Sequence, residues 1–215
     1  MVGESKTRSE EAIISNESKI YHDIVQGKYP DYYQLLTYKA LSSLFWIDKN
    51  CPKIKWVIHT DDDVILNVYQ FSKFISSLSK KRSSENYFYC RALFGKQVQR
   101  SGKWGVNISY YKSEYYPPYC DGPFWITSRK NIPHLLQSST KIDYLWVDDA
   151  YLTGLLRQNS KIGIRDVHIK YRKFFYAHVY RKYPPLAWVN IDVNKIIPYW
   201  GRIKGFYKNN ESLNH

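Results

Sequence analysis

Three consecutive aspartates, Asp61, Asp62 and Asp63, stand between the apolar runs 56–58 and 64–66. Adjacent carboxylates raise one another's pKa unless opposite charge is supplied. If the segment is extended, Asp61 and Asp63 share one face and Asp62 takes the other. Two oxygen ligands on one face at the carboxyl end of a strand suit a hard divalent cation such as Mg²⁺ or Mn²⁺. The plainer alternative is a solvated acidic turn.

The rest of the chain alternates strand-like and helix-like segments, which predicts an α/β protein with a mixed central sheet flanked by helices. Asn67 is a good N-cap for an amphipathic helix that carries Val68, Phe71, Ile75 and Leu78. Predicted strands cover residues 55–60, 87–93 and 124–127. Predicted helices cover residues 9–24, 33–46, 67–78 and 128–136, with Ser128 as a cap, and another begins near residue 148. Residues 95–119 are loop-like, and no strong period follows residue 185. We expect one domain over residues 1–215.

The composition limits the function classes. The net charge is +13, which favours anionic partners such as a nucleotide diphosphate. No nucleic-acid-binding module accompanies that charge, so we expect no nucleic-acid partner. Aromatic residues make up 17% of the chain, and Tyr and Trp suit sugar faces as well as cores. No run of about twenty apolar residues occurs, so the sequence predicts no membrane span.

The cysteines leave two interpretations open. Cys51, Cys90 and Cys120 contain no C-x-x-C pair, which argues against a zinc site. One disulfide with a free thiol fits an oxidising compartment, and three thiols fit a reducing one. Three N-glycosylation sequons begin at Asn16, Asn107 and Asn210, and they matter only in a secretory protein.

A second acidic site lies at Asp148 and Asp149, where a helix begins. Aspartate at that position is an ordinary N-cap that complements the helix dipole. A second carboxylate there, in a chain that already has a metal-like triplet, also fits a general base. Between the two acidic sites, residues 115–125 carry Pro117, Pro118 and Gly122 among aromatic residues that could line a wall.

Four segments taken together resemble a known family. They are Tyr29-Pro30-Asp31-x-Tyr33-x-x-Leu36-Thr37-x-Lys39, Thr60-Asp61-Asp62-Asp63-Val64, Tyr116-Pro117-Pro118-Tyr119-Cys120-x-Gly122 and Asp148-Asp149-x-Tyr151-x-x-Gly154. Their order and spacing resemble the β1,3-galactosyltransferase and β1,3-N-acetylglucosaminyltransferase family, glycosyltransferase family 31. The resemblance covers roughly residues 2–188. It implies a GT-A fold, Mn²⁺-dependent transfer of galactose or N-acetylglucosamine from a UDP-sugar to a glycan hydroxyl, and inversion in a β1,3 linkage.

The resemblance also implies roles for individual residues. Asp61 and Asp63 would hold the metal, with His178 or else His168 completing the site. Asp149 would be the general base, with Asp148 as the second candidate. The UDP-sugar would be bound by Asp61, Asp62, Asp63 and Lys39. The residues expected to contact the sugars are Trp104, Tyr116, Tyr119, Gly122 and Trp125.

The chain departs from the family pattern at Leu35, His59, Ala150 and Pro123. Residues 1–3 resemble the end of a first strand, so we expect most of that strand, and a membrane anchor before it, to be absent. The resemblance places such enzymes on the luminal side of the Golgi membrane. Three alternatives remain: an inactive glycan- or nucleotide-binding relative, a haloacid-dehalogenase-type phosphatase with Asp61 as nucleophile, and a basic nucleic-acid binder.

Overall fold

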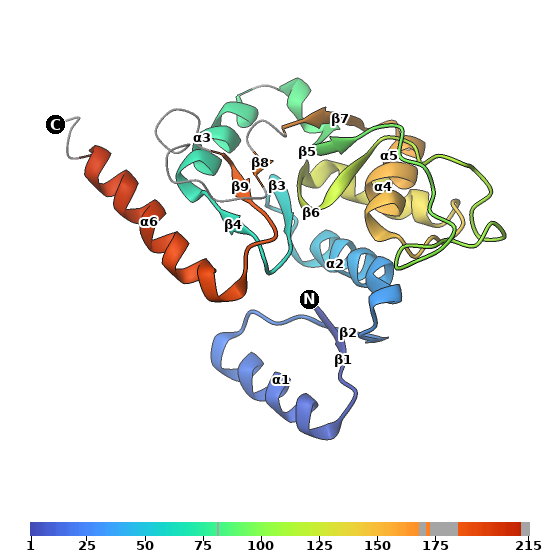
Figure 1. The fold of residues 1–215 in the computed structure, drawn as a ribbon, viewed down its shortest axis with the longest axis horizontal. Coiled ribbons are helices and arrows are strands. Elements are labelled where there is room, and N and C mark those ends of the chain that lie inside the picture. The colour runs from blue at the N-terminus through green and yellow to red at the C-terminus, as the bar shows by residue number, and fades with distance from the viewer. Residues whose placement is uncertain (81, 168–170, 173–184, 212–215) are drawn as a thin grey trace. The chain divides into compact units, whose positions relative to one another are not determined.

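The computed structural model describes residues 1–80, 82–167, 171–172 and 185–211 of the chain (Figure 1). These residues form two compact units, which we treat separately. The first unit comprises residues 1–55, 94–119 and 129–162, and the second comprises residues 56–93, 120–128 and 163–215. Both helices and strands of mixed direction occur, so the α/β prediction is confirmed.

The second unit contains a mixed four-stranded sheet in the order β3-β6-β5-β7. Strand β3 (Trp56–Thr60) is antiparallel to β6 (Tyr119–Ser128), while β5 (Tyr87–Leu93) is parallel to β7 (Gly163–Asp166). A disulfide joins Cys90 on β5 to Cys120 on β6. Cys51 has a free thiol, which confirms the first of the two cysteine interpretations.

A second, three-stranded sheet has the order β4-β9-β8. Strand β4 (Ile65–Leu66) is antiparallel to β9 (Ala187–Trp188), and β9 is parallel to β8 (Tyr171–Arg172). The 3-10 helix η2 (Arg82–Asn86) leads into β5.

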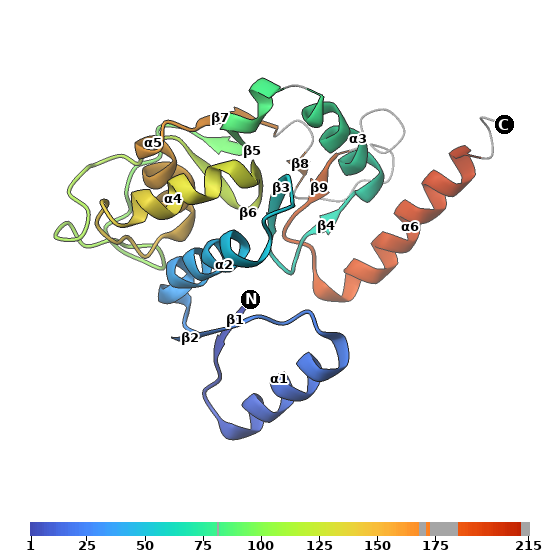
Figure 2. The ribbon, with the colours of Figure 1, turned by 180° about the vertical axis from the view of Figure 1, so that it is seen from behind.

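Helices α3 (Val68–Ser79) and α6 (Val193–Glu211) complete the second unit (Figure 2). Asn67 caps α3 as predicted, since its side chain accepts from the backbone N–H of Gln70. The amide of Asn67 also donates to the hydroxyl of Tyr207 on α6, with the two atoms 3.2 Å apart. The apolar face of α3 packs on Phe124 and Ile126 of β6, so burial of this stripe holds the helix against the sheet.

The first unit starts with two strands, β1 (Val2–Glu4) and β2 (Gln26–Pro30), which pair in parallel. In the sequence, helix α1 (Arg8–Tyr21) connects them. Thr7 and Glu10 form a capping box at the start of α1. The remaining helices follow in chain order. They are η1 (Tyr33–Leu35), α2 (Leu36–Asn50), η3 (Arg129–Asn131), α4 (Ile132–Ser139), the π-helix η4 (Ala150–Leu156) and α5 (Arg157–Asn159).

Several sequence predictions need correction. Ser128 does not cap a helix, because β6 runs to that residue and η3 intervenes before α4. The helix predicted to end at Trp46 continues to Asn50. Helix α6 was not predicted at all, and Pro198 lies inside it. Across the residues that the structure describes, no helix is both long enough and apolar enough to cross a bilayer. The number of domains stays a prediction.

Candidate active site

The aspartate triplet lies in a turn of the second unit directly after β3. Thr60 is the last residue of the strand, and β4 begins at Ile65. The backbone N–H of Asp61 donates to the carbonyl of Pro123, and the carbonyl of Asp63 accepts from the N–H of Ile191. Because the triplet is not extended, the argument that alternate side chains share a face does not apply to it. The backbone of β6 and of the segment after β9 holds the turn instead.

Asp63 is the most constrained carboxylate of the triplet. Its Oδ1 atom is buried and has no hydrogen-bond partner among the described residues. Burial raises the pKa of Asp63 and the neighbouring charges of Asp61 and Asp62 raise it further, which outweighs the lowering effect of hydrogen bonds from the backbone N–H groups of Asp63 and Asn190. An acceptor oxygen held away from water without a donor is costly, and a bound cation would remove that cost. The Oδ1 atom of Asp63 is therefore a suitable single ligand for a cation.

The ligand set around this carboxylate is incomplete. In the part of the chain that the structure describes, no group of three His, Cys, Asp or Glu residues is arranged to hold a metal ion. The two histidines predicted to complete the set, His178 and His168, lie outside the described residues. The metal-ligand role of Asp61, Asp63 and His178 therefore stays a prediction.

His59 stands beside the triplet at a position where the resemblance expects lysine. Its Nε2 atom is 3.5 Å from Oδ1 of Asp61. Its ring stacks on Trp125 across the β3–β6 pair, with ring centroids 5.0 Å apart and planes 5° apart. Trp125 is only 4% exposed and meets Phe88 edge-on. The packing of Trp125 thus fixes the imidazole close to an acidic group, and the predicted contact of Trp125 with a sugar stays untested.

The second acidic site belongs to the first unit. Asp149 is the N-cap of η4, and its Oδ1 atom accepts from the backbone N–H of Ala150 at 2.7 Å. The N-cap interpretation of this aspartate is therefore confirmed. It does not exclude the general-base role, because a cap occupies only part of a carboxylate's accepting capacity. π-helical turns are rare and often mark functional sites.

A buried tyrosine, Tyr116, is electrostatically coupled to this acidic site. Burial raises the pKa of Tyr116 to about 12, and the charge of Asp149 contributes in the same direction. Its ring stacks on Tyr111 and meets Tyr119 edge-on. At neutral pH the phenol of Tyr116 is therefore uncharged.

The proline-rich segment packs directly on η4. A Cβ atom added to Gly154 would meet the Cβ of Tyr119 at 3.2 Å and the Cγ of Pro117 at 3.4 Å. Arg157 is buried and donates to the carbonyls of Thr153, Ile162 and Pro118. Gly154 and Arg157 thus lock the two family-like segments of the first unit together.

An exposed aromatic group lies elsewhere on the first unit. The indole N–H of Trp104 donates to the hydroxyl of Tyr33 at 2.9 Å. The Lys103 ammonium lies 4.8 Å from the ring centroid of Tyr33 and 5.2 Å from that of Trp104. Tyr33 also meets Trp146 edge-on. Trp104 is 48% exposed, so this ring can offer a face to a sugar.

Lys39 makes an ion pair inside the first unit. Its Nζ atom lies 2.7 Å from Oδ1 and 2.9 Å from Oδ2 of Asp31. Oδ2 of Asp31 also accepts from the backbone N–H of Gly3. The pair therefore ties α2 to the β1–β2 strands, and the predicted binding of Lys39 to the sugar nucleotide stays a prediction.

The structure assigns the predicted site residues to both units. The triplet, Gly122 and Trp125 belong to the second unit, and Lys39, Trp104, Tyr116, Tyr119, Asp148 and Asp149 belong to the first. Sequence reasoning missed the buried contacts of Thr37 and Arg157. The Leu36-Thr37-x-Lys39 motif was the available signal for Thr37, while Arg157 had none.

A mixed α/β chain with an acidic triplet directly after a strand of its four-stranded sheet and with an acidic helix start fits the sugar-nucleotide transferases. The sequence model of the family described as "Galactosyltransferase" matches residues 1–168. The chain belongs to this family, and the family implies the GT-A fold.

Individual relatives are distant. Human "Beta-1,3-galactosyltransferase 5" is 26% identical over 78% of this chain and 54% of its own length. Human "Beta-1,3-galactosyltransferase 2" is 27% identical over 89% of this chain and 46% of its own length. Human "UDP-GalNAc:beta-1,3-N-acetylgalactosaminyltransferase 1" is 26% identical over 87% of this chain and 57% of its own length. The chain thus spans about half the length of the curated relatives it matches.

Proposed function

We propose that this protein is an inverting, metal-dependent hexosyltransferase that moves galactose or N-acetylglucosamine from a UDP-sugar to a glycan hydroxyl in a β1,3 linkage. The observation that carries the proposal is the buried, unpartnered Oδ1 of Asp63 in a chain of the galactosyltransferase family. A transferase that uses a nucleotide diphosphate needs positive charge at the diphosphate, and an acidic turn supplies it only through a cation.

Asp61 and Asp63 would hold Mn²⁺ or Mg²⁺, with His178 as the expected third ligand and Asp62 reaching the ribose or donor sugar. When bound, the cation supplies Lewis-acid stabilisation of the charge that develops on the UDP leaving group. The +13 net charge of the chain favours the approach of the anionic donor.

Asp149 would take the proton from the acceptor hydroxyl as that oxygen attacks the anomeric carbon, with Asp148 as the second candidate. General bases contribute about 10²–10⁴-fold to such reactions. Trp104, Tyr116, Tyr119 and Trp125 would hold sugar rings by stacking, and Gly122 would permit a tight turn between them.

We further propose a luminal location in the Golgi. Support comes from the Cys90–Cys120 disulfide, because disulfides persist in oxidising compartments and are rare in the cytosol. A luminal glycoprotein or glycolipid glycan would then be the acceptor.

A donor screen tests the activity. UDP release would be measured with Mn²⁺ across UDP-galactose, UDP-N-acetylglucosamine, UDP-N-acetylgalactosamine and UDP-glucose, with a panel of glycan acceptors. Acceptor-dependent UDP release from one hexose donor, abolished by EDTA, is the expected result. UDP binding without turnover of any donor would reject the enzyme in favour of a nucleotide-binding relative.

A further inference from the structure

Asn107 lies in an exposed turn whose conformation suits a covalent glycan. It begins the sequon Asn107-Ile108-Ser109. The Oδ1 atom of Asn107 accepts from both the backbone N–H and the hydroxyl of Ser109, at 2.9 and 3.0 Å. Its carbonyl oxygen accepts from the N–H groups of Tyr110 and Tyr111.

The side-chain nitrogen of Asn107, Nδ2, makes no hydrogen bond to the described residues. The hydrogen bonds of the carboxamide use Oδ1 instead. The residue is exposed, as are Ile108 at 63% and Tyr110 at 68%. A group attached to Nδ2 would therefore break no hydrogen bond of the folded state and would meet solvent.

A rigid base presents this turn. Val106 is fully buried and its N–H donates to the carbonyl of Gln99. The guanidinium of Arg100 donates to the carbonyls of Val106, Tyr111 and Ser113, which lie on both sides of the sequon. The three bonds close the loop at its base, so the chain projects the sequon outward without depending on neighbouring segments.

We propose that Asn107 is an N-glycosylation site of this protein. The C–N bond forms between Nδ2 of Asn107 and the anomeric carbon of a lipid-diphosphate-linked oligosaccharide. Nδ2 loses a proton, and the lipid diphosphate leaves with the bonding electron pair. The disulfide between Cys90 and Cys120 indicates an oxidising compartment, which is where this donor acts. The glycan would cover the exposed Ile108 and Tyr110 side chains, which otherwise form an apolar tip.

The other two sequons are weaker candidates. Asn16 lies inside α1, so its Ser18 is set by helical geometry rather than by a turn around the asparagine. Asn210 lies at the end of α6, and its Ser212 is outside the described residues.

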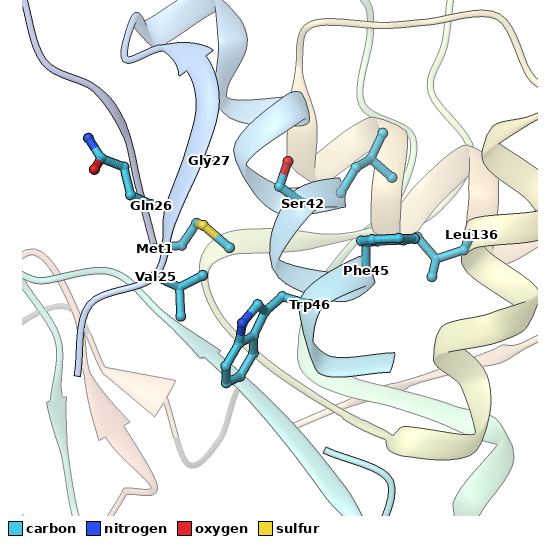
Figure 3. Close-up of a pocket in the computed structure, with 9 residues that line it drawn as sticks. Met1, Val25, Gln26, Gly27, Ser42, Phe45, Trp46 and Leu136 are labelled. Atoms are coloured by element: carbon cyan, nitrogen blue, oxygen red, sulfur yellow. The ribbon is translucent and has the colours of Figure 1, made fainter. Parts of the chain in front are cut away.

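An apolar pocket of the first unit carries no proposal. It has a volume of about 400 Å³ between the β1–β2 strands and α2, with Val25, Phe45, Trp46 and Leu136 pointing into it (Figure 3). Nothing in the structure identifies what would occupy it.

The test is translation of the whole chain, behind a cleavable signal peptide, in the presence of microsomes. The signal peptide separates this question from the proposed Golgi location and from enzyme activity. In the N16Q/N210Q double variant only Asn107 remains available. We expect a peptide:N-glycosidase-sensitive glycan on this variant and an ¹⁸O-labelled aspartate at position 107 after release in labelled water.

Two further variants make the result specific. N107Q and S109A, each in the double-variant background, should remove the glycan, since both destroy the sequon. The Cys90–Cys120 disulfide, read on a non-reducing gel, checks that these variants still fold. An unmodified Asn107 in a chain whose signal peptide has been cleaved would overturn the proposal, and so would a glycan that persists in N107Q.

Discussion

The hydroxyl of Thr37 on α2 donates a buried hydrogen bond to the carbonyl of Leu145, with the two oxygen atoms 2.8 Å apart across 108 residues of sequence. Thr37 is 1% exposed and Leu145 is 2% exposed. The bond holds the segment that leads into Asp148 and Asp149. The threonine of the family-like motif is thus a structural tether for the acidic site.

We expect T37V to destabilise the protein by about 1–3 kcal/mol, because it leaves the buried Leu145 carbonyl without its donor. Transfer activity should fall further than stability alone explains, while UDP affinity stays unchanged. Urea unfolding and steady-state kinetics measure the two effects. T37S is the matched control, since it keeps the hydroxyl. Equal stability of T37V and wild type would contradict the tether.

The D149N variant tests the general base. The amide keeps an oxygen that can cap η4 but cannot accept the acceptor's proton, so turnover should fall by about 10²–10⁴-fold with little loss of stability. UDP affinity measured by calorimetry should stay near the wild-type value. D148N should keep more activity than D149N. Loss of UDP affinity in D149N would argue against a role confined to proton transfer.

The contact between Gly154 and Pro117–Tyr119 predicts a cost for any side chain there. G154A should destabilise the protein by about 1–3 kcal/mol through overpacking. Gly201 on α6 is the matched control, because a Cβ there meets nothing within 4 Å. G201A should stabilise by about 0.5–1 kcal/mol, as expected for alanine in an exposed helix. Thermal unfolding of both variants separates the packing effect from helix propensity.

The Asp31–Lys39 pair predicts a dependence of stability on pH. Burial acts to raise the pKa of Asp31, but hydrogen bonds from Lys39 and from the Gly3 backbone outweigh it, and the pKa is lowered. A carboxyl whose pKa is lower in the folded state adds stability above its unfolded pKa. That stability disappears as the pH falls through the folded pKa.

We therefore expect D31N to lower the free energy of unfolding by about 0.5–1 kcal/mol at neutral pH, a small effect because the pair is partly exposed. At the acidic end of the pH range D31N should not change the free energy of unfolding. Urea unfolding between pH 3 and pH 7 measures the difference between wild type and variant. The exposed Asp23 provides the control D23N, which should show no such difference. A gap between D31N and wild type that is constant with pH would refute the ion-pair explanation.

The elements with clear local signals were predictable from the sequence. Strands β3 and β5 were predictable because each is a short apolar run. Helix α3 was predictable because it is amphipathic and has a side-chain cap. Helix α6 was missed because proline is not expected in a helix interior, yet α6 continues through Pro198. Its signal was nevertheless present: Ile196, Trp200, Ile203 and Tyr207 recur at helical spacing and pack in one cluster.

The candidate site was predictable only as a list of residue types. The turn at residues 61–63 depends on hydrogen bonds to Pro123 and Ile191, which are remote in sequence and carry no local pattern. Trp125 likewise stacks on His59 across a strand pair and packs edge-on against Phe88. Such long-range contacts arise from tertiary packing, so single-segment reasoning could not anticipate them.

Calorimetric titration of UDP into the protein, with Mn²⁺ and then with EDTA, tests the central claim most directly. The account predicts that wild type binds UDP only with Mn²⁺, and that Mn²⁺ with UDP at 100 times Kd stabilises the fold by about 2.7 kcal/mol. D63A should lose this binding and D23A should keep it. Equal UDP affinity of wild type in EDTA, or Mn²⁺-dependent binding that survives in D63A, would contradict a metal-held sugar nucleotide at Asp63.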